Sequence, residues 1–270
     1  HRLWRIRNIL DDITLHAGSL ESYAGIFNIL MKIKPDEIYH LGAQSYVGYS
    51  FEDEFSTFSM NINGTHYMLS AVKEFVERNT RFYFAASSEM FGKAEETPQN
   101  ENTPFYPRSA YGISKVTGYH LVKNYREAYN LHASNGILFN HESPRRGFEF
   151  VTRKISYGVA RIKKGLQKKI KLGNIKSKRD WGHAKDYVQA MWLMLQQDKP
   201  DDYVVGTGEQ HTVEEFAKKA FDYVGLNYKD YIEIDENLKR PAEVDALLAN
   251  FDKAKKVLKW QPKFSFDDLV

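Results

Sequence analysis

The chain has 270 residues, of which 42% are hydrophobic, 14% aromatic and 27% charged, with a formal net charge of +3. This aromatic content is too high for a disordered chain, and so small a net charge does not indicate a nucleic-acid-binding protein. The lack of cysteine excludes disulfides, cysteine nucleophiles and cysteine-ligated zinc, and no apolar run approaches the roughly 20 residues of a membrane span. The lack of cysteine also fits a reducing compartment, so we expect a globular, cytoplasmic protein. The histidines show no metal-ligand spacing, so we expect no metal site.

Apolar runs alternate with longer helical stretches through the first half of the chain. Strands are predicted over 13–17, 37–41, 81–86 and 132–139, and helices over 22–33, 61–77 and 109–129. This alternation is typical of the α/β class, with a doubly wound parallel sheet covered by helices on both faces. An α+β domain with mixed strand pairing is the alternative.

The pattern changes near Pro144 and Gly147, which interrupt the chain. Beyond them, helices are predicted over 151–164, 184–196, 213–224 and 253–258, and strands over 169–172 and 202–205. We expect this part to form a smaller C-terminal lobe that adds at least one strand to the main sheet.

Tyr111 and Lys115 are the first residues that suggest chemistry. Because they are four residues apart in a predicted helix, they lie on one side of it, about one turn apart. A lysine ammonium beside a phenol stabilises the phenolate and is expected to lower the tyrosine pKa, which would suit proton transfer near neutral pH. A chance match is the alternative, because the chain has 17 tyrosines.

Polar and small residues follow two of the predicted strands. The strand at 81–86 leads into Ser87, Ser88 and Glu89, and the strand at 37–41 leads into a loop of small residues at 42–45. Open α/β sheets bind ligands at the carboxyl ends of their strands, so both segments predict a binding site. The alternatives are that the serines only cap a turn and that Glu89 is a solvated loop residue.

Longer segments around these residues carry a family resemblance. They are SSEMFG (87–92), TPFYPRSAYGISK (103–115), NYREAYN (124–130), NGILFNHESPRRG (135–147), FVTRKIS (150–156), LGN (172–174), KRDWGHAKDYVQAMWLMLQ (178–196) and RPAEVD (240–245). From about Gly18 onward, the chain resembles the GDP-mannose 4,6-dehydratases, a nucleotide-sugar branch of the extended short-chain dehydrogenase/reductase family. The resemblance implies a Rossmann-like NADP-binding domain over 1–147, with some later segments packing back onto it, and a mainly substrate-binding lobe over 148–270.

Two departures from the family pattern matter. Ser87 stands where the family usually has threonine, which keeps the hydroxyl but loses the methyl that restricts its rotamer. The family also opens with a strand, a glycine-rich loop, a helix and a second strand, whereas the first glycine here is Gly18. We expect these N-terminal elements, and part of a final helix, to be missing from this chain.

The resemblance implies roles for four catalytic residues. Tyr111 would take the proton from the sugar O4 hydroxyl as C4 is oxidised, and Lys115 would hold the cofactor ribose and favour the phenolate. Glu89 would remove the C5 proton and protonate the departing C6 hydroxyl, while Ser87 would donate a hydrogen bond to O4. The product would be a GDP-4-keto-6-deoxy sugar, a step toward GDP-fucose.

The resemblance also implies two sets of binding residues. Those expected to bind NADP are Leu41, Gly42, Ala43, Gln44, Ser45, Tyr111, Lys115, His141 and Arg146. Those expected to bind GDP-mannose are Ser88, Asn140, Arg153, Lys154, Gly173, Arg179, Arg240 and Glu243. Arginine side chains suit a diphosphate because their planar fork can donate two hydrogen bonds at once. A core histidine bonded to the backbone is the alternative for His141.

Several related functions share this fold. A reductase acting on the 4-keto-6-deoxy product and a nucleotide-sugar epimerase both carry the same tyrosine–lysine pair. Glu89 after two hydroxyls favours dehydration, because an epimerase needs no C5 base that doubles as a C6 acid. A non-catalytic subunit that binds nucleotide sugars is a rival of another class. We expect a homodimer or homotetramer that binds neither nucleic acid nor membrane.

Overall fold

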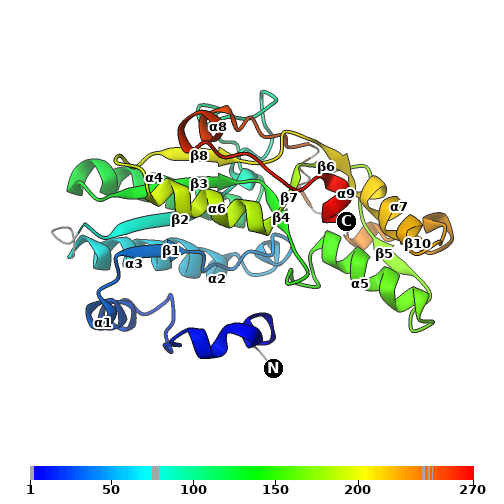
Figure 1. The fold of residues 1–270 in the computed structure, drawn as a ribbon, viewed down its shortest axis with the longest axis horizontal. Helices are drawn as coiled ribbons and strands as arrows, with labels where there is room; N and C mark the ends of the chain where they lie inside the picture. Colours follow the sequence, from blue (N-terminus) through cyan, green and yellow to red (C-terminus); the bar gives the residue numbers. More distant parts are fainter. Residues whose placement is uncertain (1–2, 75–78, 239–240, 243, 245) are drawn as a thin grey trace.

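The computed structural model describes residues 3–74, 79–238, 241–242, 244 and 246–270. Its central feature is a four-stranded sheet in the order β1 (Glu37–His40), β2 (Arg81–Ser87), β3 (Ala133–Leu138) and β8 (Asp202–Val205) (Figure 1). All three pairings in this sheet are parallel, which confirms the predicted α/β class and rules out mixed pairing here. Because β8 comes from the second half of the chain, the expected contribution of a strand from that half is confirmed.

Helices cover both faces of the sheet. They are α1 (Tyr23–Ile33), α2 (Glu54–Phe58), α3 (Gly64–Lys73), α4 (Ala110–Tyr129), α6 (Ala184–Leu195) and α8 (Asp252–Leu258). Alternate residues of β2 point to opposite faces: Phe82 and Phe84 pack with α3 and α4, whereas Tyr83 packs with α6 and α8. The unbroken apolar run at 82–86 is therefore that of a strand buried on both faces. Among the described helices, none is long and apolar enough to cross a membrane.

A smaller lobe lies at one end of the sheet, on the right in Figure 1. It contains α5 (Val151–Lys163), α7 (Val213–Tyr223), α9 (Phe266–Leu269) and the parallel pair β5 (Ile170–Leu172) and β10 (Ile232–Ile234). Ile155, Phe216 and Trp181 belong to its own hydrophobic core. The lobe thus packs around a core separate from the two that flank the main sheet.

Short elements connect the sheet to this lobe. β4 (Asn140–Glu142) pairs in parallel with β7 (Trp181–His183), and β6 (Lys178–Arg179) pairs antiparallel with β9 (His211–Thr212). A nine-residue 3-10 helix covers Trp4–Asp12. Single 3-10 turns cover Tyr49–Phe51, Ser88–Met90, Tyr228–Asp230 and Glu236–Leu238, and a π turn covers Ser59–Asn63. The sequence did not predict the strand pairs β4–β7 and β6–β9, because two or three residues are too few to show a periodicity.

One predicted strand is wrong. Residues 13–17 are exposed and form no regular element. A strand needs a neighbour to bond its backbone N–H and C=O groups, and none of the described strands pairs with this segment. The helix predicted over 61–77 starts within the π turn and continues as α3 to Lys73, and residues 75–78 lie outside the described part of the chain.

A buried ionic network ties α4 to the sheet. Asp202 of β8 accepts hydrogen bonds from Arg126 (2.5 Å) and Tyr119 (3.0 Å) of α4, and from Asn135 of β3 (2.8 Å). Burial acts to raise the pKa of Asp202, but these three donors outweigh it and hold the pKa below its ordinary value. The network therefore fixes α4, the helix that carries Tyr111, against two strands.

We predict that Asp202→Ala lowers the free energy of unfolding by roughly 3–5 kcal/mol, because Arg126 would be left buried without its ion pair. Urea denaturation measures this loss. Asp201→Ala is the matched control: its side chain is 47% exposed and pairs with Lys253 at 2.7 Å, so it should cost about 1 kcal/mol or less. Equal losses for the two variants would contradict a special role for the buried network.

Candidate active site

The end of β2 supplies the first part of the site. Ser87 is the last residue of β2, and its Oγ accepts a hydrogen bond from the Glu89 backbone N–H (3.3 Å), which begins the turn Ser88–Met90. Ser87 does cap a turn, as one alternative held. Glu89, however, is only 8% exposed, so it is not a solvated loop residue.

Helix α4 supplies the second part. Ser109 caps its N-terminus by accepting a hydrogen bond from the Gly112 N–H (3.0 Å). A Cβ atom at residue 112 would stand 2.8 Å from the Glu89 carbonyl oxygen, so glycine allows the helix to approach the turn after β2 this closely. The first turns of α4, with Tyr111 and Lys115, therefore lie beside Ser87 and Glu89.

Tyr111 and Lys115 are both buried, with exposed fractions of 9% and 4%. The Lys115 Nζ donates a hydrogen bond to the Ala85 carbonyl oxygen (2.8 Å) and lies 5.7 Å from the centre of the Tyr111 ring. Burial lowers the pKa of Lys115 to about 8, because the charged ammonium loses its hydration. The predicted placement of Tyr111 and Lys115 side by side is confirmed, although the Lys115 hydrogen bond goes to β2 and not to Tyr111.

The expectation that Lys115 lowers the Tyr111 pKa is wrong for this structure. Burial raises the pKa of Tyr111 to about 12, because the phenolate would be removed from water. A hydrogen bond with Ser87 and the charge of Arg146 act to lower this pKa, whereas Glu89 acts to raise it. Tyr111 is therefore a phenol at neutral pH, and Arg146 is a cation that favours its ionisation.

His141 lies on β4, whose position is fixed by its pairing with β7. Its Nδ1 lies 3.0 Å from the Phe139 carbonyl oxygen, and its ring stacks on Tyr187 with 4.7 Å between centroids. Burial lowers the pKa of His141 to about 4, so the ring is neutral at pH 7 and Nδ1 donates to the carbonyl. His141 is thus bonded to the backbone, as the alternative predicted, and also lines the cleft described below.

The loop after β1 is held in place by Asn61 of the π turn. The Gln44 N–H donates to Asn61 Oδ1 (2.8 Å), and Asn61 Nδ2 donates to the Gln44 carbonyl oxygen (3.0 Å) and to Ser114 Oγ of α4 (3.0 Å). One buried amide therefore joins this loop to the helix that carries Tyr111. The sequence analysis did not predict this residue, since a single asparagine in a helical stretch has no distinctive pattern.

These segments enclose a cleft of about 880 Å³ between the carboxyl ends of the strands and the smaller lobe. Most of the predicted site residues line it: Leu41, Ala43, Ser45, Ser87, Glu89, Tyr111, Lys115, Asn140, His141, Arg146, Lys154, Gly173 and Arg179. All four predicted catalytic residues are in this set. Glu142, Glu149, Asn174 and Ser177 also line the cleft and were not predicted.

Some predicted residues lie elsewhere. Gly42, Gln44 and Ser88 neighbour lining residues in the chain but are not part of the cleft surface. Arg153 is also outside the cleft surface, and its guanidinium lies over the rings of Phe148 (5.2 Å) and Tyr157 (5.8 Å). Arg240 and Glu243 lie outside the described residues.

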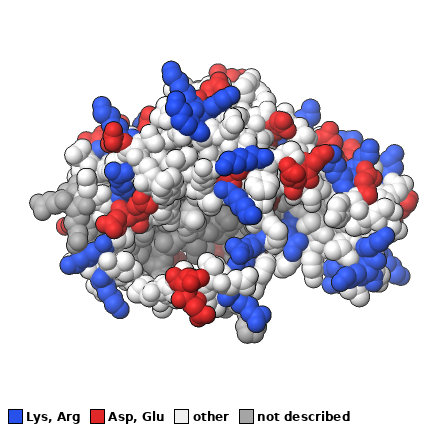
Figure 2. Space-filling view, viewed as in Figure 1, with Lys and Arg blue, Asp and Glu red and all other residues white. Residues whose placement is uncertain are grey.

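The donor set of the cleft suits a ligand with phosphate groups. Lys115 and Arg146 come from the larger part of the fold, and Lys154 and Arg179 come from the smaller lobe. On the face that Figure 2 shows, by contrast, acidic and basic side chains are interspersed over most of the surface, and a group of Lys and Arg lies over the end of α5. Cations on both sides of one cleft, beside a loop of small residues, fit a nicotinamide dinucleotide and a nucleotide sugar.

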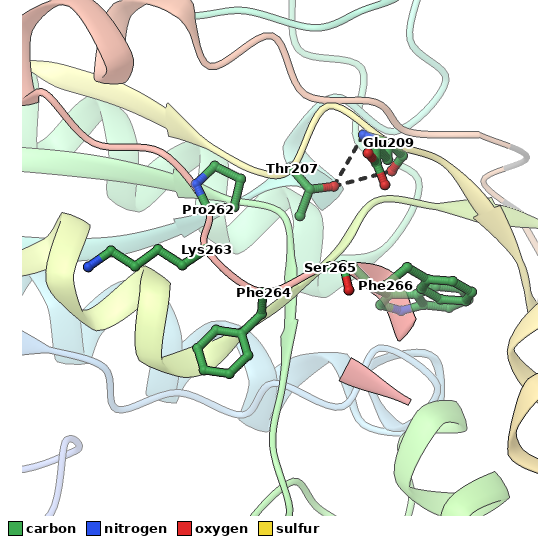
Figure 3. Close-up of a pocket in the computed structure, with 8 residues that line it drawn as sticks. Thr207, Glu209, Pro262, Lys263, Phe264, Ser265 and Phe266 are labelled. Atoms are coloured by element: carbon green, nitrogen blue, oxygen red, sulfur yellow. Dashed lines mark hydrogen bonds between the residues drawn. The ribbon is translucent and has the colours of Figure 1, made fainter. Parts of the chain in front are cut away.

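A second, smaller pocket of about 240 Å³ lies near the C-terminal segment (Figure 3). Its lining includes Thr207, Glu209 and Phe264, and the Thr207 hydroxyl contacts the backbone of Glu209. Apart from Trp181, its lining residues do not belong to the larger cleft, and none is a predicted site residue. The predicted catalytic and binding residues are therefore concentrated in the larger cleft.

Comparison with known sequences gives a consistent result. Residues 2–270 match the family model described as GDP-mannose 4,6 dehydratase. GDP-mannose 4,6 dehydratase 1 of Arabidopsis thaliana is 54% identical over 259 residues, which cover 95% of this chain and 72% of that protein. GDP-mannose 4,6 dehydratase of Homo sapiens is 48% identical over 281 residues, covering 97% of this chain and 76% of that protein.

Solved structures share the fold at lower identity. RMD from Pseudomonas aeruginosa, complexed with NADPH, has a TM-score of 0.85 at 23% identity, with 98% of this chain and 91% of that chain covered. A dTDP-glucose 4,6-dehydratase from Bacillus anthracis, in complex with NAD, has a TM-score of 0.84 at 21% identity, covering 99% and 81%. These structures support the Rossmann-like fold assigned above.

We predict that Lys115→Met changes how stability depends on pH. Since burial lowers the Lys115 pKa from 10.5 to about 8, the unfolded chain binds more protons than the folded one between these values, and the protein gains stability as pH rises through this window. The variant should lack this gain, on the order of 2–3 kcal/mol between pH 8 and 10. Urea denaturation across this window measures it, with Lys255→Met, an exposed lysine of α8, as control. Parallel curves for Lys115→Met and the parent protein would contradict the prediction.

Proposed function

This chain belongs to the GDP-mannose 4,6-dehydratase family, and from that premise we propose how its residues carry out the reaction. The protein is a lyase that converts GDP-D-mannose to GDP-4-keto-6-deoxy-D-mannose: C4 is oxidised, water is lost across C5 and C6, and C6 is reduced. The observation that supports our assignment of roles is the convergence of Ser87, Glu89, Tyr111 and Lys115 in one cleft.

We propose that the cofactor is NADP. A bound nicotinamide nucleotide supplies the acceptance and return of one hydride, which makes the reaction redox-neutral. The loop at 41–45 and the side chains of Lys115, His141 and Arg146 would hold it, because Leu41, Ala43 and Ser45 of the loop line the same cleft as these three side chains. The structures with similar folds carry NAD or NADPH, in agreement with a nicotinamide cofactor.

Tyr111 is the residue that exchanges a proton with the O4 hydroxyl in this proposal. Because its pKa of about 12 keeps it protonated at neutral pH, it needs positive charge nearby before it can act as a base. Arg146 and Lys115 are cations of the same cleft. The hydrogen bond between Ser87 and Tyr111 places the serine hydroxyl where it can also donate to O4 as negative charge develops there.

Glu89 is the residue that makes this site a dehydratase site in our proposal. It would remove the C5 proton, which is acidified by the C4 ketone, and return it to the departing C6 hydroxyl. A carboxylate that is 8% exposed is screened little by water, so it can exchange a proton with a sugar held in the cleft. An epimerase needs no C5 base that also acts as an acid at C6.

The diphosphate of GDP-mannose would bind to cations of the smaller lobe. Lys154 and Arg179 line the cleft there, together with Gly173 and with Asn140 of β4. Burial lowers the pKa of Lys154, and a phosphate beside it would favour the charged form. Roles for Ser88, Arg153, Arg240 and Glu243 in substrate binding, assembly as a homodimer or homotetramer, and a cytoplasmic location stay predictions.

We predict that a GDP-linked hexose is preferred over UDP- and dTDP-linked ones, because the segments that carry the family resemblance include those around the predicted diphosphate and nucleoside site. Turnover of GDP-mannose, UDP-glucose and dTDP-glucose can be compared at equal concentrations with NADP present. Faster turnover of either of the last two would contradict the assignment.

We predict that Glu89→Gln lowers kcat by at least about 10²-fold, as expected for a general acid–base residue, while nucleotide-sugar binding is largely kept. Product formation and isothermal titration with GDP-mannose measure the two effects. Glu95→Gln, which alters an exposed glutamate six residues further along the chain, is the matched control and should behave as the parent protein does. A near-normal rate for Glu89→Gln would remove Glu89 from the mechanism.

A further inference from the structure

Glu142 is a buried carboxylate on the wall of the cleft that none of the proposed steps uses. It is 5% exposed and ends β4, where it pairs with His183 of β7. Its Oε2 accepts a hydrogen bond from the Thr152 hydroxyl (2.6 Å) and lies 3.1 Å from Nε of Arg146. One carboxylate oxygen thus contacts both the first turn of α5 and the loop that follows β4.

A buried carboxylate destabilises the fold unless it is paired. Burial raises the pKa of Glu142, and the charge of Arg146 and the hydrogen bond from Thr152 act in the opposite direction. Both partners therefore favour the ionised carboxylate against the effect of burial. An apolar residue would join β4 to α5 without this cost, which suggests that the charge itself has a use.

The use that the geometry suggests is control of Arg146. Its guanidinium lies 3.6 Å from the centre of the Phe150 ring, and its Nε is next to Glu142, so the side chain is held from two directions. Arg146 lines the same cleft as Tyr111 and His141, and its charge lowers the pKa of both. The position of this one cation therefore affects the protonation of the proposed proton-transfer residue.

We propose that Glu142 is a positioning residue: fixed by Thr152, it holds the Arg146 guanidinium against Phe150 on the wall of the cleft that Tyr111 shares. The contact itself stands on the geometry alone, whereas its effect on catalysis rests on the proposed function. The other groups that act on the Tyr111 phenol are Ser87 and Glu89, both at the end of β2, and the Lys115 ammonium lies 5.7 Å from the centre of the Tyr111 ring.

The first test needs neither substrate nor cofactor. Nuclear magnetic resonance of ¹⁵N-arginine-labelled protein measures solvent exchange of the Arg146 Nε–H, with Arg146→Lys used to assign the signal. Glu142→Gln keeps the size of the side chain and an oxygen for Thr152, but removes the charge that faces Arg146. The Arg146 Nε–H is buried and donates no hydrogen bond to the described residues, so what shields it from water is the position in which the ion pair with Glu142 holds the guanidinium. We expect exchange to become at least about 10-fold faster when this ion pair is lost, because the guanidinium is then free to turn toward water.

The second test measures the consequence for catalysis. If Tyr111 acts as a base, kcat/KM for GDP-mannose rises with pH through its pKa, and displacing a nearby cation moves this rise to higher pH. Glu142→Gln should shift this rise, the acidic limb of the pH profile, upward by about 1 pH unit. This is the lower end of the pKa shift that a close opposite charge produces. Arg146→Met should do the same, and the double variant should shift no further than Arg146→Met alone.

Controls separate this role from a purely structural one. Glu214→Gln removes a carboxylate that pairs with Lys176 (2.5 Å). Neither residue is part of the cleft surface, so this variant should leave both exchange and pH profile unchanged. Should Glu142→Gln fail to fold, Thr152→Val keeps the charge and is expected to speed the exchange by a smaller factor, while Thr152→Ser should restore it.

Three outcomes would overturn the proposal. Unchanged exchange of the Arg146 Nε–H in Glu142→Gln, or in Thr152→Val if the former is unfolded, would show that Glu142 does not hold Arg146. A limb that moves to lower pH would show that Arg146 stays in place and that only the charge of Glu142 matters. A lower melting temperature with an unmoved limb would leave Glu142 a structural residue. A parent protein that does not turn over GDP-mannose would instead contradict the proposed function, and the exchange result would still decide the contact.

Discussion

The close contact between the start of α4 and the turn after β2 is the constraint on which the site depends. Gly112 permits it, because any side chain there would meet the Glu89 carbonyl oxygen. The Lys115 ammonium reinforces it by donating a hydrogen bond to the carbonyl oxygen of Ala85, which lies two residues before Ser87 in β2. Through this contact, a helix and a strand end that are separate in the sequence present a phenol, a carboxylate and a hydroxyl to the same cleft.

The far end of the same helix is fixed by a different kind of interaction. The Asp202 network crosses from α4 to β3 and β8, so the helix is held at its start by close backbone packing and further along by buried ionic hydrogen bonds. Such rigidity matters for proton transfer, because the donor and acceptor must stay within hydrogen-bond reach of the reacting atoms.

Burial is the second property that shapes the site. It moves the pKa of Tyr111 up and the pKa values of Lys115 and His141 down, in each case toward the neutral form. Among side chains buried to this extent, each remaining charge acts strongly on its neighbours. This explains why the position of Arg146, which Glu142 faces, affects the pKa values of Tyr111 and His141.

The cleft itself arises from the way in which the two parts of the fold are joined. The short parallel pair β4 and β7 leads from the main sheet toward the smaller lobe and carries Asn140, His141 and Glu142. The lobe contributes Lys154 and Arg179 from the opposite side. Polar and charged side chains from the two parts of the fold therefore line the same space, which suits a ligand that spans it.

The sequence by itself determined the parallel sheet, its main helices, the helical face shared by Tyr111 and Lys115, and the polar end of β2, because these follow from local periodicity and from the order of strands and helices. The strand expected over 13–17 failed because a strand also needs a neighbour, which local pattern does not provide. Only the tertiary structure decided that Tyr111 is made less acidic by burial, that Asn61 holds the loop after β1, and that Glu142 faces Arg146. Each of these depends on distances between segments far apart in the chain, and on how much water those segments exclude together.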